Sequence, residues 1–151
     1  MEQQQLIDDL LSFLKNDNAV KETMACLNKK AEIEIRVAQT NSIKVHYDGD
    51  KVVVIPEKAL APDFIFDASP EAIAVLIAEN NLTPAQLGIK FMKQLISRDI
   101  KVSMPSSIFQ ITRKGYLNIM KVGGMEFIAE LKKHNLASIP KITAALAKLR
   151  K

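Results

Sequence analysis

The chain has 151 residues, of which 48% are hydrophobic and 25% are charged, with a single cysteine and no tryptophan. This length and balance are typical of one globular domain with its own core, and they argue against a disordered or collagen-like chain. One cysteine excludes an internal disulfide and a zinc site built from cysteines.

Charge is unevenly spread along the chain. Residues 1–99 hold 11 Lys+Arg and 15 Asp+Glu, whereas residues 100–151 hold 10 and 2. The basic C-terminal third suggests an anionic partner such as a membrane surface, although a solvated lysine-rich face would have the same composition. The longest apolar run, residues 72–78, is too short to span a bilayer, and the first residues do not resemble a signal peptide. We therefore expect a cytoplasmic protein.

The first third of the chain predicts helices followed by strands. Residues 3–15 and 19–28 show apolar residues at helical spacing. Residues 31–38 and 43–47 alternate between apolar and polar, which is typical of half-buried strands. The turn Asp48-Gly49-Asp50 predicts a hairpin that returns through residues 51–55.

Residues 63–104 are the centre of the chain and read strand, helix, helix, strand. Residues 63–67 are a short apolar strand, after which Ser69 and Pro70 occupy the N-cap and first position of a helix. That helix has no polar residue from 72 to 78, so more than one of its sides must be covered. Thr83 and Gln86 have capping-box spacing for the next helix, and residues 100–104 alternate as a strand.

The remaining third predicts further helices. One begins after Pro105 and ends at Gly123-Gly124, with Gly115 as a break or a close approach; others cover residues 125–133 and 140–151. Together these elements predict an α+β fold, a five-stranded mainly antiparallel sheet with helices on one face plus extra C-terminal helices. We expect one domain in residues 1–124 and a basic helical extension in residues 125–151.

No pattern in the sequence predicts catalysis. His46 and His134 lack a companion at metal-ligand spacing, and there is no phosphate-binding loop or nucleophile motif. Turn and strand-end roles account for the aspartates, Asp63 included. We therefore expect no enzyme activity, no cofactor and no metal.

Apolar surface is the feature that remains. The helices offer more apolar faces than one five-stranded sheet can cover, so either the helices cover each other or a lipid supplies the cover.

Three segments resemble the sterol carrier protein type-two (SCP-2) family of small lipid-binding domains. Residues 62–71 look like the family's strand followed by a Ser-Pro-Glu helix start, residues 82–86 like its second helix start, and residues 100–102 like its last strand. The resemblance covers about residues 3–122. The chain departs from the family by lacking glycines around the last strand and by its tail after Gly124.

The resemblance implies an apolar tunnel between the sheet and the helices for a sterol, fatty acyl or isoprenoid quinone lipid. The matching positions would line it or close its mouth: Leu76, Ile77, Leu87, Phe91, Leu95, Ile100, Val102, Met104, Ile108, Phe109 and Met120. Bacterial members look like accessory factors in quinone biosynthesis, and this small chain would suit that role.

Two functional hypotheses follow. In the first, the chain is a lipid carrier whose tail touches an anionic membrane through Lys141, Lys148, Arg150 and Lys151. In the second, the fold has a filled core and serves as a protein-interaction or accessory module, by pairing with another protein or with itself. Nucleic-acid binding has less support, because Phe127 is the only aromatic residue in the tail and no stacking platform is available.

Overall fold

The structure is a computed structural model that describes residues 2–134, 141, 144, 145, 147 and 148. Its elements follow in this order along the chain: α1 (Glu2–Asn16), α2 (Asn18–Met24), β1 (Ile33–Val37), β2 (Asn41–Tyr47), β3 (Val52–Ile55), β4 (Phe64–Ala68), α3 (Pro70–Ile77), α4 (Pro84–Ile96), β5 (Ile100–Ser103), α5 (Ile108–Arg113), the 3-10 turn η1 (Tyr116–Asn118) and α6 (Ile119–Lys133).

The five strands form one sheet in the order β3-β2-β1-β4-β5. Every neighbouring pair is antiparallel except β1 and β4, which are parallel. The parallel pair arises because the segment after β3 crosses the sheet before β4 begins beside β1. A mainly antiparallel five-stranded sheet in an α+β fold is therefore confirmed, and the parallel central pair is an addition to what the sequence predicted.

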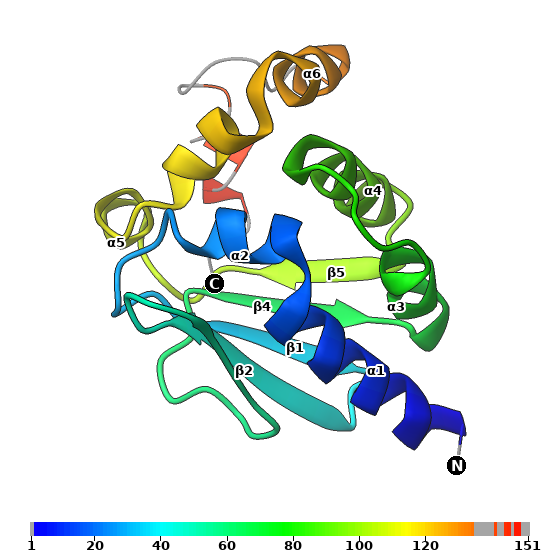
Figure 1. Cartoon of the computed structure of the whole chain (residues 1–151). Helices are drawn as coiled ribbons and strands as arrows, with labels where there is room; N and C mark the ends of the chain where they lie inside the picture. The colour runs from blue at the N-terminus through cyan, green and yellow to red at the C-terminus, as the bar shows by residue number, and fades with distance from the viewer. Residues whose placement is uncertain (1, 135–140, 142–143, 146, 149–151) are drawn as a thin grey trace.

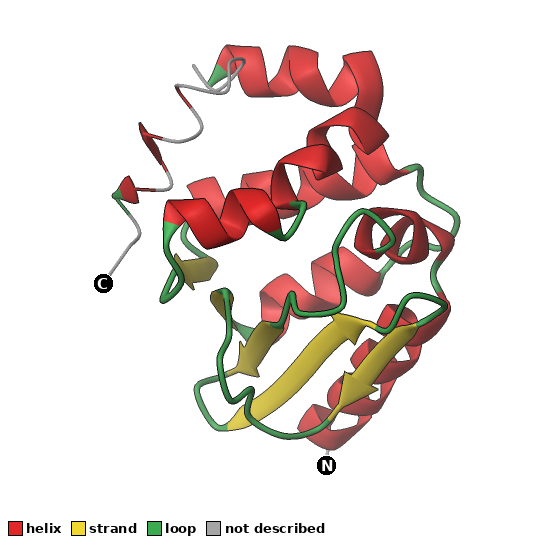
Figure 2. Cartoon of the chain, turned by 90° about the vertical axis from the view of Figure 1, so that its left-hand side faces the viewer, coloured by secondary structure: helices red, strands yellow, loops and turns green. Residues whose placement is uncertain are grey.

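The helices lie over one face of this sheet, which we call the inner face (Figures 1 and 2). Strand side chains that point to it include Val37, Ile43 and Val45, all buried in one core with residues from α1 and α2. The opposite, outer face carries polar side chains such as Arg36 and Lys44. The alternation in the sequence predicted this division between the two faces.

Three helices begin where the sequence predicts, because each has a local cap. The hydroxyl oxygens of Ser69, Thr83 and Ser107 accept hydrogen bonds from the backbone N–H three residues later, at 3.1, 3.1 and 3.2 Å. At α4 the Gln86 side chain also accepts from the Thr83 backbone N–H, which completes the predicted capping box.

The helix that the sequence predicts after Pro105 breaks at Gly115, the residue at which the sequence predicts a break or a close approach. Gly115 has φ +93° and separates α5 from η1. A Cβ at this position would collide with the Cys26 carbonyl oxygen. The break thus brings the chain against the end of α2, where the Asn28 N–H also donates to the Lys114 carbonyl oxygen at 3.0 Å.

The glycine pair 123–124 divides α6 into two helical segments that meet at a kink, as the sequence predicts. Gly124 has φ 66° and ψ −159°, a conformation that is essentially restricted to glycine, and helical turns continue on both sides of it. Beyond the kink the Phe127 ring lies against Gly88 of α4, where a Cβ would be 2.9 Å from the ring. Of the predicted extension, the part up to Lys133 thus packs on α4.

None of the helices in the described part of the chain combines the length and the hydropathy of a membrane-spanning segment.

Candidate functional site

Part of the inner face is covered less completely than the rest. The apolar side chains of Ile33 and Ile35 on β1 are half-buried, as are Phe66 on β4 and Val102 on β5. On the adjacent strand β2, by contrast, Ile43 is 1% and Val45 2% exposed. The incompletely covered area therefore lies over β1, β4 and β5, and we call its four residues, Ile33, Ile35, Phe66 and Val102, the open strip.

The partial exposure of Ile33 and Ile35 is unexpected, because β1 is the middle strand of the sheet. This strand lies between β2 and β4, so solvent reaches its inner side chains only through the space between the sheet and the helices. On the outer face of the same strand Glu34 is 1% exposed, under a loop whose Ala59 N–H donates to its carboxylate at 3.0 Å. The usual order, in which a sheet buries its helix-covered face and exposes the other, is reversed at the middle of β1.

The helices opposite the open strip also present half-buried apolar side chains. Leu87, Phe91 and Leu95 lie on the inward side of α4, and Leu76 lies on α3. The Phe91 ring contacts Phe66 edge to face, with centroids 5.0 Å apart. The two layers therefore touch at this aromatic pair, while the apolar surface around it keeps partial contact with solvent.

The residues expected to line a tunnel occupy three kinds of environment. Ile100 and Met104 are fully buried core residues, and the half-buried members pack against that core: Leu76, Ile77, Leu87, Phe91, Leu95, Val102 and Ile108. Phe109 is 65% exposed, with the Arg113 guanidinium 5.4 Å from its ring centroid. Met120 is half-buried in α6. The structure thus brings together the fully buried residues and the half-buried residues that pack against them. That these residues line a lipid tunnel stays a prediction.

Sequence reasoning missed three residues of the open strip, Ile33, Ile35 and Phe66. Their alternation marks them as inward-facing. Strand order, however, decides which inward residues lie opposite α4, and β1 pairs with β4 across 31 residues of sequence. No local signal in the sequence could have indicated this pairing.

A buried polar cluster closes one end of the sheet. Asp63 is 1% exposed, and its carboxylate accepts from Lys114 Nζ at 2.7 Å, from the Tyr116 hydroxyl at 2.8 Å and from the Glu32 N–H at 3.0 Å. Burial, and then the nearby Asp63 charge, raise the pKa of Tyr116 well above its ordinary value, so the phenol stays a donor. The role of Asp63 at a strand end agrees with the sequence prediction, and its three donors make it an anchor for η1.

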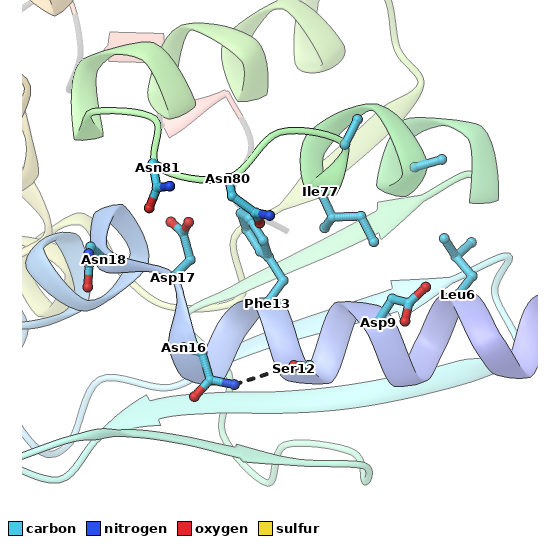
Figure 3. Close-up of a pocket in the computed structure, with 12 residues that line it drawn as sticks. Leu6, Asp9, Ser12, Phe13, Asn16, Asp17, Asn18, Ile77, Asn80 and Asn81 are labelled. Atoms are coloured by element: carbon cyan, nitrogen blue, oxygen red, sulfur yellow. Dashed lines mark hydrogen bonds between the residues drawn. The ribbon is translucent and has the colours of Figure 1, made fainter.

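Two grooves lie elsewhere on the surface. The larger, about 790 Å³, runs between α1 and α3, and the smaller, about 280 Å³, lies beside the β1–β2 turn. Figure 3 shows the larger one, where Asp9 and Phe13 rise from α1 and Ile77 lies across from them on α3. Of the predicted lining residues only Ile77 borders either groove. Within the described residues, no three His, Cys, Asp or Glu side chains gather as metal ligands would.

Comparisons with known proteins add a likeness to a solved structure. No family model matches the chain, and no curated protein matches it. A solved structure titled "UbiJ-SCP2 Ubiquinone synthesis protein" is similar over 75% of this chain and 88% of its own, with 17% identity and a TM-score of 0.44. That title names the family that three segments of this sequence resemble.

Proposed function

We propose that this chain is a non-enzymatic lipid-binding protein that holds the apolar chain of a long-chain lipid between its inner sheet face and α3–α4. The observation that carries the proposal is the open strip: half-buried apolar side chains on the central strands face half-buried apolar side chains on α4. Apolar surface left in contact with water on both layers is stabilised by an apolar guest.

The energy available is sufficient for retention of such a guest. Full burial of one large apolar side chain is worth roughly 1.5–3 kcal/mol, and a lipid chain would complete the burial of several. Lipid sites are mostly apolar with few polar groups, and the open strip and the facing side of α4 supply aliphatic and aromatic side chains of this kind. A sterol, a fatty acyl chain or an isoprenoid quinone tail would each suit this lining.

The tail supplies a membrane contact in this proposal. Lys141 and Lys148 are exposed. Arg150 and Lys151, the other two predicted contact residues, lie outside the described part of the chain. Each basic side chain near an anionic membrane contributes about 1 kcal/mol, enough for reversible docking during loading and unloading.

The second candidate is a protein-interaction or accessory module on the same fold. Exposed large apolar residues favour it, in particular Phe109, Ile96 and Met125, of which Met125 is 82% exposed. Such a module would form a stable complex or oligomer that does not respond to lipid.

A tryptophan substitution on the inner sheet face distinguishes the lipid-binding protein from the protein-interaction module. Val102→Trp places a large ring on the inner face of β5, and Ile65→Trp, a matched control, places one on the outer face of β4 next to Phe66. We expect Val102→Trp to abolish the lipid that native mass spectrometry detects in purified protein, with unfolding free energy within about 1 kcal/mol of the parent. Ile65→Trp should retain lipid.

The opposite result would contradict the proposal. If the interior is filled, Val102→Trp overpacks it and destabilises the chain by roughly 1–3 kcal/mol. A lipid carrier would be excluded by three results together: this loss of stability, no lipid in the purified parent protein, and no transfer of lipid between liposomes. A lipid-insensitive oligomer in light scattering would then support the interaction module.

A further inference from the structure

We propose that the groove between α1 and α3 is a docking site for a cationic amphipathic helix of a partner protein. This site shares only Ile77 with the residues predicted to line the lipid tunnel, and it does not depend on the proposed lipid.

The groove has the shape of a seat for a helix. On α1 its wall is formed by residues spaced along one side of the helix, from Leu6 through Asp9 and Phe13 to Asn16. Ten residues of helix rise roughly 15 Å, so the groove runs along about three turns. The other wall comes from α3 and the turn that follows it, with Ile77 and Asn80 lying across from α1 (Figure 3).

The lining of the groove combines apolar and acidic side chains. Apolar lining comes from Leu6, Phe13 and Ile77, with Ala74 of α3 and Ala78, the residue that follows α3. Polar lining comes from two carboxylates, Asp9 and Asp17, and from several asparagine amides and a serine. No lysine or arginine is among the described residues that line the groove. A partner with apolar anchors between basic side chains matches both parts.

Each carboxylate is held in place by the chain. Asp9 accepts from the Gln5 side-chain amide at 2.8 Å. Asp17 caps α2 by accepting from the Val20 N–H at 3.2 Å. A carboxylate has about four lone-pair sites, so each of these groups keeps acceptor capacity for a cationic partner.

A helix fits this site better than a membrane or a small molecule. A helix inserts side chains at i, i+3 or i+4, and i+7 into an apolar groove, and a third helix laid along two others follows ordinary helix packing. An anionic bilayer would be repelled by Asp9 and Asp17. The groove is open along its length, whereas small-molecule sites enclose most of their ligand.

Two adjacent aspartates provide a matched pair of variants. Asp8 and Asp9 are both exposed on α1, and each accepts from the glutamine amide four residues earlier, yet only Asp9 lines the groove. The probe is a labelled helical peptide with leucines on one face and lysines on the other, added to the full chain and followed by fluorescence anisotropy. A second peptide carries glutamates in place of the lysines.

We expect the lysine peptide to bind and the glutamate peptide not to bind. Asp9→Asn should weaken binding roughly two- to fivefold, the range of one surface ion pair, and Asp8→Asn should leave it unchanged. Ala74→Trp, which fills the groove from an exposed position of α3, should abolish binding. Val102→Trp, the lipid-site variant, should not alter it.

Equal effects of Asp8→Asn and Asp9→Asn would show only general attraction to an acidic surface and would overturn the docking site. Failure of the lysine peptide to bind would do the same, as would binding that survives Ala74→Trp. Self-association of the chain that is lost in Asp9→Asn without any peptide would assign the groove to a second copy instead of a partner protein.

Discussion

At the scale of single residues, the most constrained group is the carboxylate of Asp63. Three donors converge on it, from Glu32 just before β1, from Lys114 and from Tyr116 of η1, and the last two lie more than 50 residues after Asp63. A buried charge is tolerated only when it is paired and hydrogen-bonded in this way. The cluster therefore fixes how the chain after β5 attaches to the sheet.

Ionisation of the Tyr116 hydroxyl makes the free energy of unfolding depend on pH. Its pKa is raised from 10.0, chiefly by burial, so the folded state holds the phenolic proton at pH values where the unfolded chain releases it. Stability is therefore fully present below pH 10 and falls as pH rises above it, by up to about 1.4 kcal/mol per pH unit from this group. Urea unfolding at pH 9, 10 and 11 should show a shallower decline in Tyr116→Phe than in the parent. Parallel declines would contradict the assignment.

At the scale of elements, α4 joins the two layers. Its inward side presents Leu87, Phe91 and Leu95 to the sheet, and its other side takes the Phe127 ring against Gly88. The close approach of α6 is possible because residue 88 has no side chain. Anything that frays α4 therefore disturbs both the proposed lipid layer and the attachment of α6.

The capping box of α4 can be tested directly. Thr83→Ala removes the hydroxyl that accepts from the Gln86 N–H, and we expect a loss of about 1 kcal/mol in unfolding free energy with faster amide exchange in the first turn of the helix. Thr83→Ser keeps the hydroxyl and should stay near the parent. If both variants lose the same stability, the cap is not the cause.

At the scale of the whole molecule, the fold is a sheet with one well-covered half and one partly covered half. The inner residues of β2, Ile43 and Val45, are buried in the core, whereas the open strip is half-buried and meets α4 at the Phe66–Phe91 contact. This asymmetry separates the proposed lipid layer from the groove between α1 and α3, so two ligands of different chemistry could be held at once.

A ligand that binds only the folded state raises its stability by mass action. A long-chain fatty acid at about 100 times its dissociation constant adds roughly 2.7 kcal/mol. For a domain of this size that corresponds to a rise of roughly 5–10 °C in Tm. Thermal unfolding of delipidated protein should show this rise, and Val102→Trp should not. A parent Tm that is unaffected by fatty acids, sterols and prenyl quinones would contradict a lipid site.

The sequence by itself determined what local interactions decide. Ser69, Thr83 and Ser107 cap helices through N–H groups three residues away, and the alternation in β1 and β2 assigns each side chain to a face, so these elements and the α+β class could be predicted. Only the tertiary structure decided the parallel pairing of β1 with β4, the Cys26 carbonyl as the group that Gly115 approaches, and the partial cover of Ile33 and Ile35. The physical reason is range: caps and alternation act within four residues, whereas strand order and helix cover depend on contacts between distant segments that no local pattern records.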